Sequence, residues 1–143
     1  LDTNLSQALS DAVKHQQPYS VALLDQDKFK LINDRWGHIV GDQVLAKTAE
    51  IIESKLRPND KLFRFGGDEW LIIMPKTPQK LAKQVLDYSK ESYCGYEFRS
   101  SNNESFFSTF SYGIAESSNM KTAKEWVIHA DNNLYENKRK KAA

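Results

Sequence analysis

Three carboxylates in two segments carry the clearest chemistry in this 143-residue sequence. Asp25 ends a short apolar run, and Asp68 and Glu69 directly follow a Gly-Gly pair. An isolated carboxylate at the end of a buried strand costs free energy unless it meets a metal ion, a cation or several donors. Carboxylate oxygens are also the ligands that hard divalent cations prefer. If the two segments are neighbours in the fold, these side chains converge on one site.

The Gly-Gly pair lies between two β-favouring runs, residues 61–65 and 70–74. Glycine tolerates the positive φ of a tight turn and allows a phosphate or another backbone to come close. We therefore predict a β-hairpin with Asp68 and Glu69 at its tip. Taken alone, a solvated acidic turn explains these residues equally well, because short motifs match by chance.

The other segments supply the elements that position the carboxylates. Apolar residues recur at helical spacing in residues 5–13, 44–56, 81–88 and 123–134, whereas residues 20–24 and 106–115 have strand patterns. The resulting order, α-β-α-β-β-α-β-α with one hairpin, predicts an α+β fold in which helices cover an antiparallel or mixed sheet.

Composition indicates a single domain that buries one core. Twenty basic and nineteen acidic residues leave a net charge of +1, which argues against nucleic acid or a membrane surface as partner. One cysteine, Cys94, excludes an intrachain disulfide and a cysteine zinc site, in keeping with a cytoplasmic location. No apolar run has the length of a transmembrane helix.

Four segments, in order, resemble the landmarks of GGDEF domains, the diguanylate cyclase family. They are residues 25–42, 64–70, 109–115 and 130–138. Four ordered motifs over nearly the whole chain are far more specific than any one of them. The resemblance implies a palm-like, ferredoxin-related, mostly antiparallel sheet flanked by helices. It also implies that two copies, as a homodimer, condense two GTP into cyclic di-GMP and release pyrophosphate.

In-line attack on an α-phosphate builds charge that divalent cations held by carboxylates stabilise. By resemblance, Asp25, Asp68, Glu69 and the backbone carbonyl of Gln26 bind Mg²⁺ or Mn²⁺, two ions per active site. Glu69 either binds metal or helps to deprotonate the 3′-hydroxyl, and Asp68, Glu69 and Lys30 are the expected catalytic residues. A surface cluster of carboxylates is the alternative explanation.

Guanine recognition falls to Asn33 and Asp42 by the same resemblance. A carboxylate can accept from N1–H and the 2-amino group of guanine, and an amide can donate to O6 or N3. Alternatively, Asp42 is the N-cap of the helix that Gly41 and Asp42 open, and Asn33 is a turn residue.

The resemblance places Lys30 and Lys138 on the phosphates, helped by backbone N–H groups between Phe29 and Lys30 at a helix start. The family usually continues Lys-x-x-Gly-Arg-Asn, whereas this chain ends Lys-Arg-Lys-Lys-Ala-Ala. Arg139 or Lys140 could replace the missing arginine, although a solvated basic helix end explains the run equally well.

Arg57 and Asp60 stand in an Arg-x-x-Asp pattern five residues before the Gly-Gly pair. Active relatives carry an inhibitory site for cyclic di-GMP at this place. A helix-ending loop that contains Pro58 is the competing interpretation.

Two departures from the family limit the comparison. Trp70 stands where the family has Phe, so we expect local repacking. The usual upstream segment is absent, so we expect a fragment of a longer protein with a sensory or dimerising region upstream. Attachment of that full-length protein to a membrane is compatible with this expectation. A catalytically silent receptor for cyclic di-GMP or GTP is the alternative function, and a purely structural dimerisation module is the third.

Overall fold

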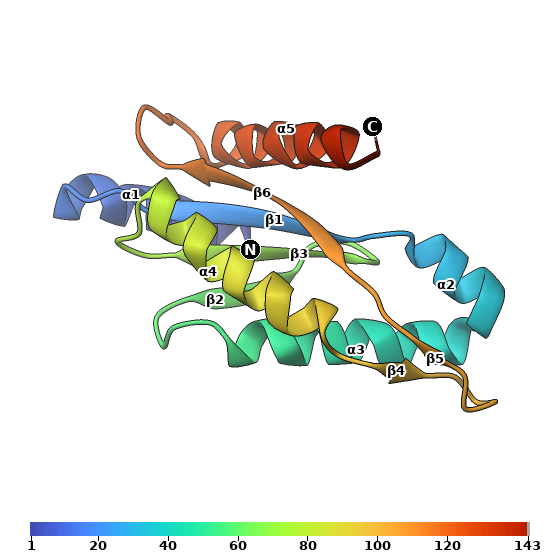
Figure 1. The fold of residues 1–143 in the computed structure, drawn as a ribbon. Coiled ribbons are helices and arrows are strands. Elements are labelled where there is room, and N and C mark those ends of the chain that lie inside the picture. The colour runs from blue at the N-terminus through green and yellow to red at the C-terminus, as the bar shows by residue number, and fades with distance from the viewer. Residues whose placement is uncertain (143) are drawn as a thin grey trace.

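The computed structural model describes residues 1–142 and is drawn in Figure 1. In chain order the elements are α1 (Asp2–His15), β1 (Ser20–Gln26), α2 (Phe29–Trp36), α3 (His38–Ser54), β2 (Lys61–Arg64), β3 (Glu69–Met74), α4 (Gln79–Cys94), β4 (Phe98–Arg99), β5 (Ser105–Phe106), β6 (Phe110–Glu116) and α5 (Ala123–Ala142). None of the helices in this range is both long enough and apolar enough to cross a membrane.

Four antiparallel strands in the order β2-β3-β1-β6 form the central sheet, and β4 and β5 form a separate two-stranded ribbon. β1 is a central strand whose apolar run is buried on both faces. Alternate side chains of β1 enter two cores, with Ala22 and Leu24 on the side of α3 and α4, and Val21 and Leu23 on the side of α1 and α5. The predicted α+β class with an antiparallel, helix-covered sheet is confirmed.

Helix α3 begins at His38, three residues earlier than the predicted start at Gly41. Gly37 precedes it with φ 90°, a left-handed conformation that favours glycine, and separates α3 from the short helix α2. Asp42 therefore lies inside α3, and its interpretation as an N-cap is wrong. The helix start expected at Phe29 is confirmed as the beginning of α2.

Two predicted apolar faces differ from the observed ones. Val13 of α1 is 77% exposed, and α4 exposes Leu81 and Tyr88. The buried positions of α4 include two polar residues, Ser89 and Tyr93, whose hydroxyl groups find partners inside the protein. A pattern based on hydrophobicity alone misses such a face, because it does not count polar residues as buried.

The strand predicted over residues 106–115 is divided in the structure. Residues 107–109 separate β5 from β6, and β5 leaves the main sheet to pair with β4. Trp36 stacks on Phe106 with ring centroids 5.1 Å apart, which holds β5 against α2. Trp70 is 2% exposed and belongs to the core between the sheet and α3.

Candidate functional site

The three carboxylates meet at one end of the central sheet. Asp25 in β1 is the direct cross-strand partner of Glu69 in β3. The backbone N–H of Gln26 donates to the Asp68 carbonyl at 3.0 Å, so the hairpin tip is fixed against the end of β1. The backbone N–H of Phe65 donates to the Glu69 carbonyl at 2.9 Å and closes the predicted hairpin.

The charges at this end of the sheet repel one another. Partial burial raises the pKa of Asp25, the ammonium group of Lys138 opposes this shift, and the negative charges of Asp68 and Asp27 add to it. Burial also raises the pKa of Glu69, and so do the charges of Asp25 and Asp68. Lys138 compensates this concentration of carboxylates only in part, and the carboxylate oxygens suit a hard divalent cation.

The carboxylates are not arranged as a finished metal-binding group. Over the described part of the chain, no three Asp, Glu, His or Cys residues have the geometry to hold a metal ion. Asp25 instead accepts a hydrogen bond from Lys138, with 2.5 Å between Oδ2 and Nζ. The predicted ligands are therefore neighbours, but a cation would have to replace the Lys138 ammonium group at Asp25.

The side chain of Gln26 anchors this end of β1 in a buried polar network. Its Nε2 donates to the Tyr93 hydroxyl at 2.8 Å and to the Ser108 hydroxyl at 2.5 Å. Thr48 Oγ1 lies 3.1 Å from Gln26 Oε1. This role of Gln26 was not predicted from the sequence. A glutamine at the end of a strand buried on both faces is nevertheless a signal, because its amide needs internal partners.

Asn33 and Asp42 lie on α2 and α3, next to the Gly41 backbone. Asn33 Oδ1 is buried and has no hydrogen-bond partner within residues 1–142. A Cβ added to Gly41 would lie 1.8 Å from that oxygen, so Asn33 occupies space that only a glycine leaves open. An unpaired buried acceptor costs about 1–3 kcal/mol, which a donor on a ligand would recover. Asp42 is exposed on the surface beside it.

The predicted phosphate-binding lysines are in different states. Lys30 is exposed on the first turn of α2, next to the half-buried Phe29, whereas Lys138 reaches Asp25 from α5. Arg139 pairs with Glu136 of its own helix at 3.0 Å and so does not turn toward the site.

A second lysine of α5, which the sequence analysis passed over, joins the first. Lys141 Nζ lies 2.5 Å from Asp27 Oδ2, and Ser111 donates to the other oxygen of Asp27 at 2.7 Å. Two lysine–aspartate pairs, from Lys138 and Lys141, thus hold the end of α5 against the end of β1. The sequence signal for these two pairs is the three-residue spacing of Lys138 and Lys141, which places both lysines on one face of a helix.

Arg57 and Asp60 form a closed ion pair away from the carboxylates. Arg57 Nε and Nη2 donate to the two oxygens of Asp60, each at 2.9 Å, and the Arg57 backbone N–H donates to Asp60 Oδ2. Arg57 Nη2 also contacts the Thr77 hydroxyl at 2.5 Å. The Asp60 side chain is 1% exposed and that of Arg57 is 37% exposed, beside a cavity of about 470 Å³.

Comparison with known proteins gives matches over almost all of the chain. It is 29% identical over 140 residues to diguanylate cyclase DosC of Escherichia coli and 32% identical over 139 residues to diguanylate cyclase DgcS of Shewanella oneidensis. These alignments cover 98% and 94% of this chain. They cover only 30% and 44% of the relatives, so the chain spans less than half of either protein.

Solved structures agree with the sequence matches. Diguanylate cyclase SiaD of Pseudomonas aeruginosa, solved with its activator SiaC, superposes with TM-score 0.92 at 35% identity, over 97% of this chain and 53% of that chain. The GGDEF domain of DgcB from Caulobacter crescentus, solved with c-di-GMP, superposes with TM-score 0.91 at 30% identity, over 96% of this chain and 82% of that chain.

The sequence model of one family, described as diguanylate cyclase, GGDEF domain, matches residues 1–143. The resemblance inferred from the four motifs is therefore confirmed, and this chain belongs to the GGDEF domain family.

Proposed function

We propose that this domain is a diguanylate cyclase, which condenses two GTP molecules into cyclic di-GMP and releases pyrophosphate. One observation carries the proposal: Asp25 lies directly opposite Glu69, with Asp68 beside them at the same end of the sheet. The relatives named diguanylate cyclase extend well beyond the matched region, so the activity of the whole protein is part of this proposal.

Asp25, Asp68, Glu69 and the backbone carbonyl of Gln26 would hold the divalent ions, Mg²⁺ or Mn²⁺, in a pair. When bound, these ions supply Lewis-acid stabilisation of the charge that develops on the α-phosphate and on the departing pyrophosphate. The raised pKa values of Asp25 and Glu69 support this assignment, because a cation would relieve the repulsion that helps to raise them.

The other residues bind and orient the nucleotide. Lys30 supplies positive charge to the phosphates. The backbone N–H groups at the start of α2, beside Phe29, donate hydrogen bonds to them. The exposed carboxylate of Asp42 accepts from the N1–H and 2-amino groups that distinguish guanine from adenine, and the amide of Asn33, whose Oδ1 has no partner within residues 1–142, donates to O6 or N3. Glu69, whose pKa is raised by burial, is suited to accept the proton of a 3′-hydroxyl.

Lys138 has two anionic partners in this scheme. It pairs with Asp25 in the present structure, and it would be available to the triphosphate if a divalent ion were held by the Asp25 carboxylate. Neither Asp25 nor Lys138 would then lose its opposite charge. Asp25 would exchange the Lys138 ammonium group for the divalent ion, and Lys138 would exchange Asp25 for the triphosphate.

Chemistry needs two copies of the domain. One copy has one set of residues that bind guanine and phosphate, so it holds one GTP. A homodimer brings two GTP molecules together, with the 3′-hydroxyl of each facing the α-phosphate of the other. Because the dimer holds the two GTP molecules side by side, their reaction no longer requires an encounter of free molecules in solution.

Arg57 and Asp60 form the proposed inhibitory site for cyclic di-GMP. The geometry refines the roles, since Asp60 is buried and its oxygens are occupied by Arg57. Arg57 contacts the product through its exposed side, next to the cavity of about 470 Å³, while Asp60 orients it.

The experiment is turnover by a domain that is forced to dimerise through a fused coiled coil. We expect cyclic di-GMP from GTP and Mg²⁺, detected by chromatography, little product from ATP, and loss of product with Asp68→Ala. Full turnover by Asp68→Ala would reject the metal assignment. Comparable use of ATP would reject the role of Asp42.

A second candidate function is a catalytically silent receptor for cyclic di-GMP or GTP. The ion pair between Lys138 and Asp25 favours it, because that pair occupies a predicted metal ligand. Calorimetric binding of either nucleotide by the forced dimer, with no turnover at saturating Mg²⁺, would select this function over the first.

A further inference from the structure

A groove of about 920 Å³ runs along β6, between α4 and α5. β6 is the edge strand of the sheet, and Figure 1 shows it between these two helices. The floor of the groove includes Ser111, Tyr112 and Ile114, and none of the proposed metal or guanine residues lines it. This volume falls within the range of small-molecule sites, roughly 300–1,000 Å³.

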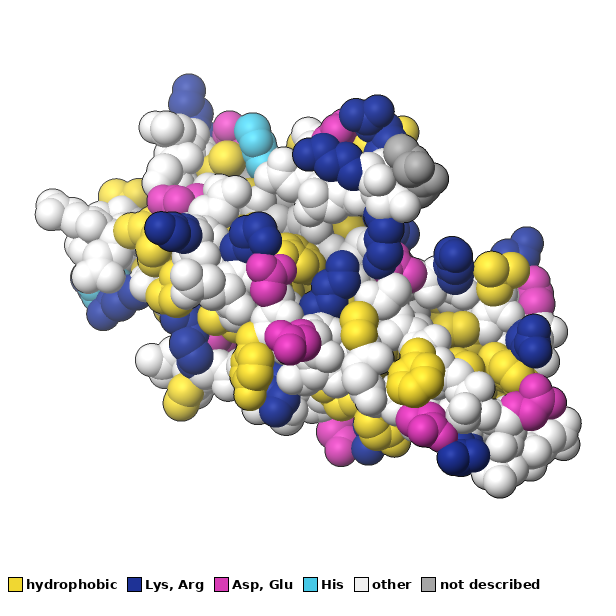
Figure 2. Space-filling view, in the orientation of Figure 1, with side chains coloured by type: hydrophobic (Ala, Val, Ile, Leu, Met, Phe, Trp, Pro, Cys, Tyr) yellow, Lys and Arg dark blue, Asp and Glu magenta, His cyan; other side chains and the backbone are white. Residues whose placement is uncertain are grey.

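Both walls of the groove are basic. Five lysines line it, with Lys80, Lys83 and Lys90 on α4 and Lys140 and Lys141 on α5. Figure 2 shows dark blue side chains in the band between the two helices, in the middle of the view. The net charge of the chain is only +1, so this is a local concentration of positive charge and not a property of the whole surface.

The two acidic residues of the groove are already engaged. Asp87 accepts from Lys83 at 2.8 Å and from the Tyr112 hydroxyl, and Glu136 pairs with Arg139 at 3.0 Å. Their negative charge is therefore not available to the remaining lysines.

Lys90 is the most buried of these cations. It is half-buried and forms no salt bridge with any residue that the structure describes. Burial lowers its pKa, and the neighbouring ammonium group of Lys141 lowers it further. Its Nζ lies 6.0 Å from the centroid of the Tyr112 ring, at the floor of the groove. An anion held between Lys90 and the α5 lysines would relieve this repulsion.

The edge of β6 is closed to an added strand. Asn133 donates to the Ile114 carbonyl at 2.6 Å, and Asn137 donates to the Tyr112 carbonyl at 2.7 Å. Peptides that bind by strand addition need such backbone groups to be free. A ligand of this groove must therefore be recognised through side chains, mainly through ammonium groups.

We propose that the groove between α4 and α5 binds a soluble small molecule that carries several phosphate groups. Lysines act as point charges for phosphate, and the two walls place them on both sides of a ligand of this size. The site goes beyond the proposed GTP site, which comprises the end of β1, the residue 66–69 turn, α2, Asp42 of α3 and Lys138 of α5.

Occupancy of the groove would reach the proposed active site through α5. Lys141 lines the groove and also pairs with Asp27, while Lys138, one turn earlier, pairs with Asp25. A ligand phosphate that attracts Lys141 competes with Asp27 and loosens the last turn of α5 on β1. The groove is thus placed to affect the position of Lys138.

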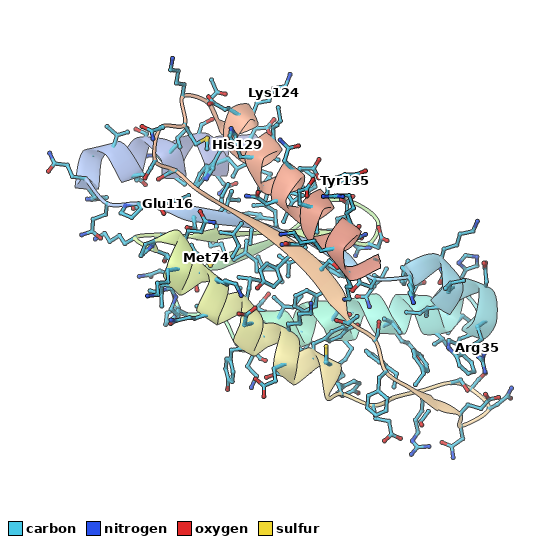
Figure 3. The ribbon with its side chains drawn as sticks, turned by 45° about the horizontal axis from the view of Figure 1, so that its top comes forward. Arg35, Met74, Glu116, Lys124, His129 and Tyr135 are labelled. Atoms are coloured by element: carbon cyan, nitrogen blue, oxygen red, sulfur yellow. The ribbon has the colours of Figure 1, made fainter. Side chains whose placement is uncertain are left out.

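The test is calorimetric titration of the domain with inorganic tripolyphosphate, without divalent metal, together with ¹H–¹⁵N spectra. We expect binding with the largest shifts at backbone amides of β6 and α4. The double variant Lys90→Gln with Lys140→Gln should bind at least about tenfold more weakly, because each change removes a charged contact. Lys124→Gln is the matched control, since Figure 3 places Lys124 at the opposite end of α5.

Wild-type affinity in the double variant would overturn the proposal. Shifts confined to α2 and the residue 66–69 turn would also overturn it, because they would assign the binding to the proposed GTP site. Lys90→Arg should retain binding, and loss of binding in that variant would reject the role of charge at this position.

Discussion

The Asp25 end of the sheet and the Arg57–Asp60 loop both gather charged side chains, but they satisfy them in opposite ways. Asp60 is buried with three hydrogen bonds from Arg57, so its charge is fully used inside the protein. At the sheet end, burial and then neighbouring carboxylates raise the pKa of Glu69, and Asn33 Oδ1 has no partner in the described chain. The loop is stable as it stands, whereas the sheet end holds polar groups that a ligand would satisfy.

From this difference we expect substitution of Asp25 to affect mainly activity and substitution of Asp60 to affect mainly stability. Asp25→Asn should lower turnover of the forced dimer about a thousandfold, because about 4 kcal/mol of charge stabilisation is lost with a metal ligand. Its free energy of unfolding should change by less than about 1 kcal/mol, since the change also removes repulsion from Asp68 and Glu69. Turnover and urea unfolding measure the two effects.

Asp131→Asn is the matched control for this prediction. Asp131 is exposed on α5, and its charge contributes to the raised pKa of Glu69 without being a predicted ligand. Its turnover should stay within about twofold of the original, because a screened surface charge has a small effect. Equal losses in both variants would show that overall charge, and not ligation, sets the rate.

Asp60→Ala should show the opposite pattern. It leaves the partly buried Arg57 guanidinium without its carboxylate and should cost about 2 kcal/mol of stability in urea unfolding, less than for a fully buried pair. Basal turnover should persist, while inhibition by cyclic di-GMP should weaken as Arg57 loses its orientation. Asn59→Ala, at an exposed position of the same loop, should leave both properties unchanged. Unchanged stability in Asp60→Ala would remove the contrast between the two regions.

Gly41→Ala tests the unpaired amide. The new methyl group would lie 1.8 Å from Asn33 Oδ1, so the amide must move away from its position. We expect the KM for GTP to rise about tenfold, which corresponds to about 1.4 kcal/mol, with kcat less affected. Gly95→Ala is the control, because its added Cβ meets only ordinary contacts at 3.7 and 3.8 Å. An unchanged KM would separate Asn33 from nucleotide binding.

The sequence predicts the sheet end better than its surroundings for physical reasons. Asp25 ends an apolar run and the Gly-Gly turn is local, so the pairing of Asp25 with Glu69 follows from two neighbouring strands. The pair between Lys138 and Asp25 joins residues 113 positions apart, and no local pattern encodes it. The network of Gln26 depends on Tyr93 and Thr48 from two helices, which become neighbours only when the core forms.

The backbone sets a second limit on prediction from sequence. The division between α2 and α3 depends on Gly37 at φ 90°. The sequence alone does not show whether a glycine within a helical pattern adopts a positive φ. The error placed Asp42 at a helix start and offered it a capping role. Because α3 begins at His38, the exposed Asp42 carboxylate does not cap this helix. It is therefore available to a ligand, as is Asn33 Oδ1, which has no partner within residues 1–142.

The smallest effect is the pH dependence of stability, and it also distinguishes the sheet end from a satisfied ion pair. Burial and neighbouring carboxylates raise the pKa of Glu69 above its ordinary value of 4.5, so its contribution to stability is complete below pH 4.5 and is lost as pH rises through the raised pKa. Burial of Asp87 is outweighed by hydrogen bonds from Lys83 and Tyr112, which lower its pKa below 3.8. Asp87 therefore contributes stability above pH 3.8 that is lost as pH falls through its lowered pKa.

Glu69→Gln and Asp87→Asn should change the pH profile in opposite directions. Urea unfolding between pH 3 and 7 should show a smaller loss of stability toward neutral pH in Glu69→Gln, and a smaller loss toward acid in Asp87→Asn. Each effect should be about 0.5 kcal/mol, because solvent screens both groups. Parallel profiles for the two variants would contradict the sign of the Glu69 shift. They would mean that the carboxylates at the sheet end are already compensated, as Asp60 is, and that the end has no unmet demand for a cation.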